Sequence, residues 1–185
     1  MPVAPSIRGR NSNPYHLTNM KIETPRDLFF DQLQDLFSVE NQLKTSLPNL
    51  ARRARNEQLA AFLMEHLSET ERHLDTVFQI LTSYGHEPGG DTCRAMEGLI
   101  AGGDAHLDRV EVATTRDLMI IAHCLRIANY EVAAYEITST LAQQLGFAEE
   151  AVVLKNILQQ ERRAGDYLAR LQPILFDNAT RIILK

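Results

Sequence analysis

The chain has 185 residues, of which 44% are hydrophobic and 23% are charged, and its formal net charge is −5. This length suffices for one domain with a real core, while the mild acidity argues against a nucleic-acid partner, because phosphate binding needs a basic excess. No apolar run approaches the about 20 residues of a membrane-spanning helix and no secretory signal is visible, so we expect a cytoplasmic protein without a membrane partner.

The N-terminal part divides into a leader and a first long helix. Residues 1–22 are rich in Pro, Asn and Ser, which predicts a disordered leader. Thr24 followed by Pro25 and Asp27 is a typical helix start, and the helix is expected to run to about Arg55 with a kink near Pro48. Its apolar residues recur at steps of three and four: Phe29, Leu33, Leu36, Leu43, Leu47 and Leu50.

Three further long helices follow, over about residues 57–84, 115–145 and 148–171. Asn56 caps the first of them, glycines end the first two, and Pro173 is expected to stop the last. The Gly-rich stretch 86–114 is expected to hold one short helix, over 92–100. We therefore divide the chain into the leader 1–22, a helical domain 23–173 and an apolar tail 174–185, which is expected to dock on the body or on a partner subunit.

The lengths of the connections predict the topology. The first two long helices are joined tightly, and so are the last two, and short connections make antiparallel neighbours. The middle connection of about 30 residues is long enough to travel the length of a bundle. Two antiparallel hairpins with one long crossover, plus a short extra helix in that crossover, form an all-α, ferritin-like four-helix bundle.

A polar residue interrupts the apolar stripe near the middle of every long helix. Steps of three and four keep residues on one helix face, so these side chains are predicted to point into the bundle. They comprise one acidic group per helix and two imidazoles: Glu40, His66, Glu69, His73, Glu131 and Glu161.

Four buried carboxylates need compensation, because an unpaired buried charge costs several kcal/mol. Two divalent cations would balance four negative charges, and carboxylate with imidazole suits iron or manganese. The alternative is that these residues are solvated flank residues, as helix-interior Glu and His usually are. His86, His106 and His123 fall outside the pattern and are expected on the surface or in loops, while Cys93 and Cys124 are expected to be small buried residues without a disulfide.

Several segments together resemble the YciE/YciF family of ferritin-like proteins over about residues 24–172. The segments are LQDLFSVENQLKTSL at 33–47, His66-Leu67-Ser68-Glu69-Thr70 with His73, Cys93-x-Ala95-Met96-x-Gly98-Leu99, and Tyr130-Glu131-Val132-Ala133-Ala134-Tyr135. The resemblance implies a bacterial stress-response protein, a homodimer, and a ferroxidase-like activity that oxidises Fe(II) with dioxygen or peroxide. Tyr130 and Tyr135 are expected to donate hydrogen bonds near such a centre.

The chain departs from the family pattern at two positions. Ala128 and Gly165 stand where the family commonly has acids, on the faces of Glu131 and Glu161. The alternatives for the metal are therefore a dinuclear site, one ion instead of two, weak binding, or no binding. The functional rival is therefore a non-catalytic structural stress protein of the same fold with a degenerate site. A DNA-protecting ferritin relative is a weaker option, against which the acidic charge argues, although Arg8 and Arg10 lie in the leader.

Overall fold

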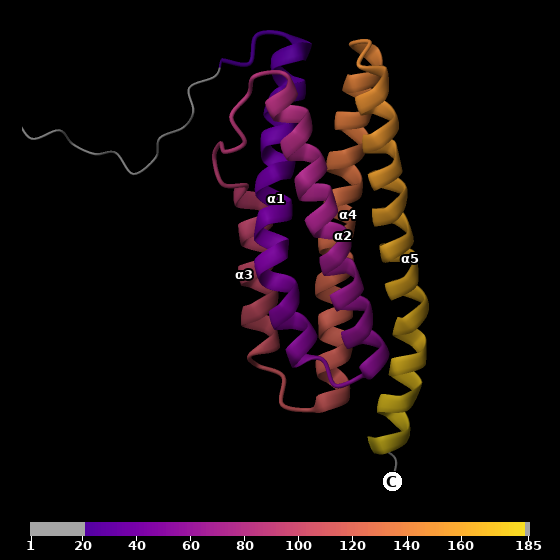
Figure 1. Cartoon of the computed structure of the whole chain (residues 1–185). Helices are drawn as coiled ribbons and strands as arrows, with labels where there is room; N and C mark the ends of the chain where they lie inside the picture. Colours follow the sequence, from indigo (N-terminus) through magenta and orange to yellow (C-terminus); the bar gives the residue numbers. More distant parts are fainter. Residues whose placement is uncertain (1–20, 184–185) are drawn as a thin grey trace, which may run out of the picture.

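The computed structural model describes residues 21–183, with side chains through Asp177, and these residues form five α-helices and no strand. Four long helices run side by side along the bundle, and the shorter α3 lies on its outer face (Figure 1). The all-α bundle with an extra helix in the crossover is thereby confirmed. The helices are α1 (Pro25–Arg53), α2 (Glu57–Ser83), α3 (Arg94–Leu107), α4 (Ala113–Gln144) and α5 (Ala148–Ile183).

The ends of the long helices follow from local capping chemistry. The Thr24 hydroxyl accepts a hydrogen bond of 3.1 Å from the Asp27 backbone N–H, and the Asp27 carboxylate accepts one of 2.9 Å from the Thr24 N–H. The Asn56 side chain accepts a 2.9 Å hydrogen bond from the Leu59 N–H at the start of α2. Gly146 has a φ of 80°, which lets the chain turn sharply between α4 and α5.

The apolar core consists of two clusters that lie at different heights of the bundle. On α1, Leu36 belongs to one cluster and Leu43 to the other, so Glu40 falls between them. The same holds on α4, where Ile127 and Tyr135 belong to different clusters and Glu131 lies between. The core therefore leaves a polar layer at mid-height, enclosed by apolar side chains on both sides.

Two helix boundaries differ from the sequence prediction. The short helix spans Arg94–Leu107 instead of 92–100. It continues past the glycines because Leu107 at its end is buried and Gly103 packs closely against the His123 ring. The last helix does not stop near Pro173 but continues to Ile183. A proline inside a helix removes one backbone hydrogen bond, and here burial of Leu175 in the core compensates, so this part of the tail docks on the body.

The remaining histidines give one further correction. His123 was expected on the surface, but it is only 1% exposed, because α3 covers it: a Cβ added at Gly103 would lie 2.1 Å from its ring. His106 is exposed on α3, and His86 lies in the loop between α2 and α3, where its ring stacks on Phe30 with the ring centroids 3.9 Å apart. Residues 1–20 of the predicted leader and residues 184–185 of the tail lie outside the described residues. Within residues 21–183, no helix combines the length and hydropathy that crossing a membrane requires.

Candidate metal centre

The structure brings five of the six residues predicted from the sequence into one buried layer. Each of the four long helices contributes to it, and all five side chains lie between the two apolar clusters: Glu40, His66, His73, Glu131 and Glu161, with exposed fractions of 0, 6, 2, 0 and 0%. The sixth, Glu69, lies at the rim with 28% of its side chain exposed. The buried carboxylates of this layer thus number three, one fewer than the sequence pattern indicated.

His66, Glu131 and Glu161 form the tightest group. One ligand atom from each of them lies within 4.8 Å of the other two. Nε2 of His66 is 3.7 Å from Oε2 of Glu161. Side chains from α2, α4 and α5 therefore converge on one point, although they are far apart in the sequence.

His73 and Glu40 adjoin this group through Glu161. Nδ1 of His73 lies 3.2 Å from Oε1 of Glu161 and 3.6 Å from Oε1 of Glu40. The two oxygens of Glu161 consequently face two different imidazoles, His66 through Oε2 and His73 through Oε1. This is the arrangement in which one carboxylate can be shared by two neighbouring cations.

The opposite nitrogens of both imidazoles are held by residues at the rim. Nδ1 of His66 lies 3.4 Å from Oε2 of Glu69, and Nε2 of His73 lies 2.6 Å from Oε1 of Gln160. An acceptor on one ring nitrogen fixes the imidazole's tautomer and leaves the other nitrogen's lone pair free for a metal. Glu69 is therefore placed to orient a ligand. Gln160 had no sequence signal, because it lies one residue off the inward stripe of its helix.

The two tyrosines near the candidate ligands have different surroundings. The Tyr135 hydroxyl donates a buried hydrogen bond of 2.5 Å to Oε1 of Glu40, so it supports the centre directly. The Tyr130 hydroxyl instead donates to Oδ2 of Asp35 at 3.0 Å and lies 3.0 Å from Sγ of Cys93. Tyr130 thus points away from the centre, toward the start of α3.

Burial and mutual repulsion make the layer hold protons. Burial raises the pKa of Glu40, and burial with the nearby Glu161 and Glu40 raises the pKa of Glu131 well above its usual range. Burial alone would lower the pKa of His73, but the Glu161 and Glu40 carboxylates outweigh it and raise that pKa to about 10. Without a metal, protons therefore supply the positive charge that the layer needs.

The donor set fits a divalent cation. Both oxygens of Glu131 and Oε2 of Glu40 are buried and accept no hydrogen bond from the described residues. Buried polar atoms are nearly always satisfied, so such atoms in one layer indicate a missing partner. Imidazole nitrogen together with carboxylate oxygen is the donor chemistry that iron and manganese accept.

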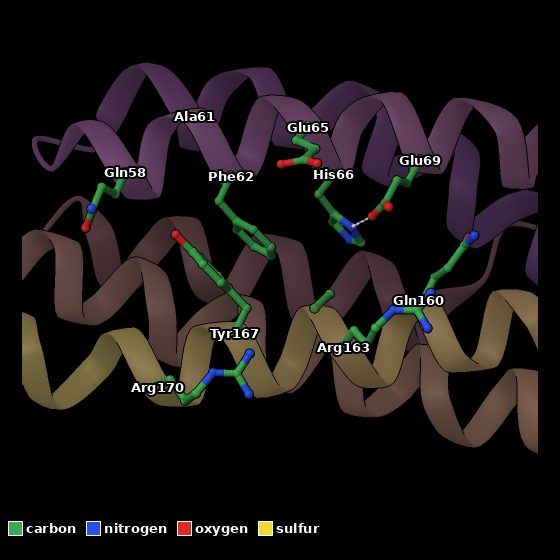
Figure 2. A pocket seen from close by; sticks show the side chains of 11 residues that line it. Gln58, Ala61, Phe62, Glu65, His66, Glu69, Gln160, Arg163, Tyr167 and Arg170 are labelled. Carbon is green, nitrogen blue, oxygen red and sulfur yellow. Dashed lines mark hydrogen bonds and ion pairs between the residues drawn. The ribbon is translucent and has the colours of Figure 1, made fainter.

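A groove between α2 and α5 leads from the surface to the rim of the layer. Its volume is about 450 Å³, and Figure 2 shows His66 pointing into it from α2, joined to Glu69 by a dashed line, with Arg163 and Tyr167 on the opposite helix. The rings of Phe62 and Tyr167 stack across it at 4.5 Å. The groove therefore gives small solutes a route to His66.

A second groove, of about 340 Å³, runs between α4 and α5. Ala128 and Gly165 line it together with Glu161, and a Cβ added at Gly165 would meet only the Cβ of Ala128, at 3.8 Å. The two positions where acids were expected from the resemblance thus lie side by side. Their small side chains leave open space beside the centre in place of further ligands.

Comparison with known proteins supports the resemblance. The sequence model of a family described as "Domain of unknown function (DUF892)" matches residues 24–180. Protein YciF of Escherichia coli strain K12 is 35% identical over 144 residues, which cover 77% of this chain and 87% of that protein.

Solved structures of similar proteins share the bundle. The crystal structure of the E. coli stress protein YciF superposes with a TM-score of 0.80 at 32% identity, covering 84% of this chain and 99% of that one. YcfI from Rhodopseudomonas palustris gives a TM-score of 0.78 at 29% identity, with 82% and 96% covered. A Xanthomonas campestris protein, XCC3681, is 17% identical with a TM-score of 0.71 over 88% and 100%, which shows the fold alone.

Proposed function

The chain belongs to the DUF892 family, and from that premise we propose that its mid-bundle layer binds Fe(II) or Mn(II) and supports a ferroxidase-like oxidation of Fe(II). The observation that carries the proposal is the convergence of His66, Glu131 and Glu161 within 4.8 Å, with both Glu131 oxygens buried and lacking a hydrogen-bond donor among the described residues. Such a cluster is costly unless a cation compensates it.

The donors offer one compact position for an ion and a second, less compact one beside it, whose members are linked pairwise through Nδ1 of His73. His66, Glu131 and Glu161 would hold the first ion, and Glu40, His73 and Glu161 would hold a second, with Glu161 shared. Two divalent ions against three carboxylates leave one positive charge over, whereas one ion leaves one negative charge that a protonated His73 balances. One ion therefore leaves the layer neutral, whereas two ions need one further negative charge, and the stoichiometry has to be measured.

An iron ion held by these residues would supply one-electron chemistry toward dioxygen or peroxide. The residues of the chain then have distinct roles. Tyr135 holds Glu40 by donating to Oε1, Gln160 and Glu69 orient the two imidazoles, and the flanking apolar clusters keep bulk water out. The protons held in the metal-free layer are released as cations bind, because metal ligands must be deprotonated.

An anaerobic titration tests the proposal. Fe(II) is added to the purified protein, bound metal is quantified, and the rate of Fe(III) formation is followed after air is admitted. We expect one or two ions per chain and accelerated oxidation in the wild type, and loss of both in Glu131→Gln. Glu136→Gln is the matched control, because Glu136 is an exposed carboxylate on the same helix.

The rival function is a structural stress protein of the same fold whose layer binds no metal. Absence of bound iron and manganese, with a melting temperature unchanged by either metal, would favour this rival and overturn the proposal. The homodimer and the oxidant stay predictions as well. Light scattering tests the former, and oxidation rates measured with dioxygen and with hydrogen peroxide test the latter.

A further inference from the structure

Thr70 is a buried hydroxyl residue that the proposed centre has not yet used. It lies on α2 between His66 and His73, and its exposed fraction is 0%. Its Oγ1 makes no hydrogen bond with any described residue. A buried hydroxyl without a partner costs free energy, so its retention in a core layer calls for an explanation.

The other hydroxyls of this type in the bundle show what Thr70 could have done. A threonine inside a helix commonly donates to the carbonyl four residues earlier. Among the described residues five threonines do so, at 2.8–3.2 Å: Thr45, Thr76, Thr82, Thr138 and Thr140. Thr70 makes no such bond to the carbonyl of His66, so its hydroxyl is left available to another acceptor.

The position of Thr70 indicates where that acceptor lies. With 3.6 residues per turn, His73 lies about 20° from His66 around the helix, and Thr70 lies about 40° from His66 on the side opposite Glu69. Glu69 faces the groove, whereas Thr70 is fully buried. Thr70 therefore lies on the buried side of α2, one turn from His66 and within one turn of His73, the two candidate metal ligands of this helix.

We propose that the Thr70 hydroxyl donates a hydrogen bond to the small exogenous ligand, a water or a compact anion, that completes the coordination of an ion held by His66, Glu131 and Glu161. The inference rests on the proposed function, since it requires a bound ion. Thr70 contributes no charge and adds no ligand. Thr70 favours small ligands with a lone pair that faces α2. It does not displace any metal ligand that the four helices supply.

Two variants and one control test this role. Thr70→Val replaces the hydroxyl with a methyl group of similar size, Thr70→Ser keeps the hydroxyl, and Thr138→Val is the control, because Thr138 is equally buried but already donates to Ala134 at 2.8 Å. In metal-free protein we expect Thr70→Val to raise the melting temperature by about 2–4 °C, because it removes an unsatisfied group, and Thr138→Val to lower it.

The second arm uses azide as the probe on protein loaded with Fe(III), and the readouts are the azide dissociation constant and its charge-transfer band. We expect Thr70→Val to weaken azide binding by about 3- to 10-fold and to shift the band, while Thr70→Ser and Thr138→Val stay within about twofold of the wild type. Unchanged azide binding in Thr70→Val, in a wild type that does bind iron, would overturn the Thr70 role alone. A wild type that binds no iron would overturn the proposed function and this inference together.

Discussion

Nε2 of His73 lies 2.6 Å from Oε1 of Gln160, so a hydrogen bond joins α2 to α5 one residue before Glu161. The amide oxygen accepts the proton of Nε2, which leaves Nδ1 facing the Glu161 and Glu40 carboxylates. One polar contact at the rim thereby sets the direction in which a buried imidazole presents its lone pair.

We predict that Gln160→Leu weakens metal binding at the position that includes His73 by about 10- to 100-fold, as loss of a partner that orients a histidine ligand usually does. The dissociation constant for Mn(II), measured by calorimetry, checks this. Gln159→Leu is the matched control, because Gln159 is the exposed neighbour on the same helix. Equal affinities for the two variants would show that the contact does not position His73.

We expect the stability of the metal-free folded protein to fall as the pH rises. The pKa of His73 is about 10 in the folded protein against 6.5 as its ordinary value, because the Glu161 and Glu40 carboxylates outweigh the effect of burial. When the pKa of a group is higher in the folded than in the unfolded state, its protonation stabilises the folded protein. This contribution is complete below the unfolded-state pKa and is lost as pH rises toward 10. Burial shifts the pKa of Glu40 and Glu131 in the same direction.

We therefore expect the melting temperature of metal-free protein to fall between pH 7 and pH 10. The increase in melting temperature on adding Mn(II) should grow over the same range, because fewer protons compete for the ligands. Thermal scans with a chelator and with metal at four pH values measure both trends. If the melting temperature of the metal-free protein instead rises with pH over this range, the side chains of the layer do not hold protons as proposed.

The groove between α2 and α5 should limit how fast ions reach the layer. Ala61 is an exposed residue of its lining, so Ala61→Trp is expected to fill the groove without disturbing the core. We predict several-fold slower Fe(II) uptake in stopped-flow measurements, with an unchanged equilibrium affinity. Ala105→Trp, at an exposed site on α3, controls for the added ring, and equal slowing in both variants would refute the route.

The packing of α3 depends on one glycine. A Cβ at Gly103 would lie 2.1 Å from the His123 ring, so Gly103→Ala is expected to destabilise the protein by about 1–3 kcal/mol. Gly102 has nothing within 4 Å of an added Cβ, and Gly102→Ala should stabilise by about 0.5–1 kcal/mol through helix propensity. Chemical denaturation of both variants checks the contrast, and similar effects would mean that His123 does not pack against α3.

Hydropathy periodicity was sufficient to predict the bundle and most of the layer. Glu40, Glu131 and Glu161 lie three or four residues from apolar core residues of α1, α4 and α5. Residues at these steps share one helix face, so the three carboxylates point inward with the core. Connection lengths gave the two hairpins, and capping residues gave most helix ends. These features are local, so a single sequence contains them.

What could not be predicted depends on neighbours across the fold. On α2, Glu69 and Thr70 lie on either side of the line through His66 and His73, and periodicity alone does not tell which one faces the core. The groove beside α5 makes Glu69 the rim residue and leaves Thr70 buried. In the same way, His123 is buried only because α3 covers it, and Gln160 matters only because His73 lies opposite.

The central claim is that a cation binds between His66, Glu131 and Glu161. The most direct measurement is an anomalous difference map from crystals of the protein grown with Mn(II). We predict a peak within about 2.0–2.5 Å of a His66 nitrogen and of oxygens from both glutamates, the usual range for such ligand bonds. A map with no peak in this layer at saturating Mn(II), or with peaks only at exposed carboxylates, would contradict the account.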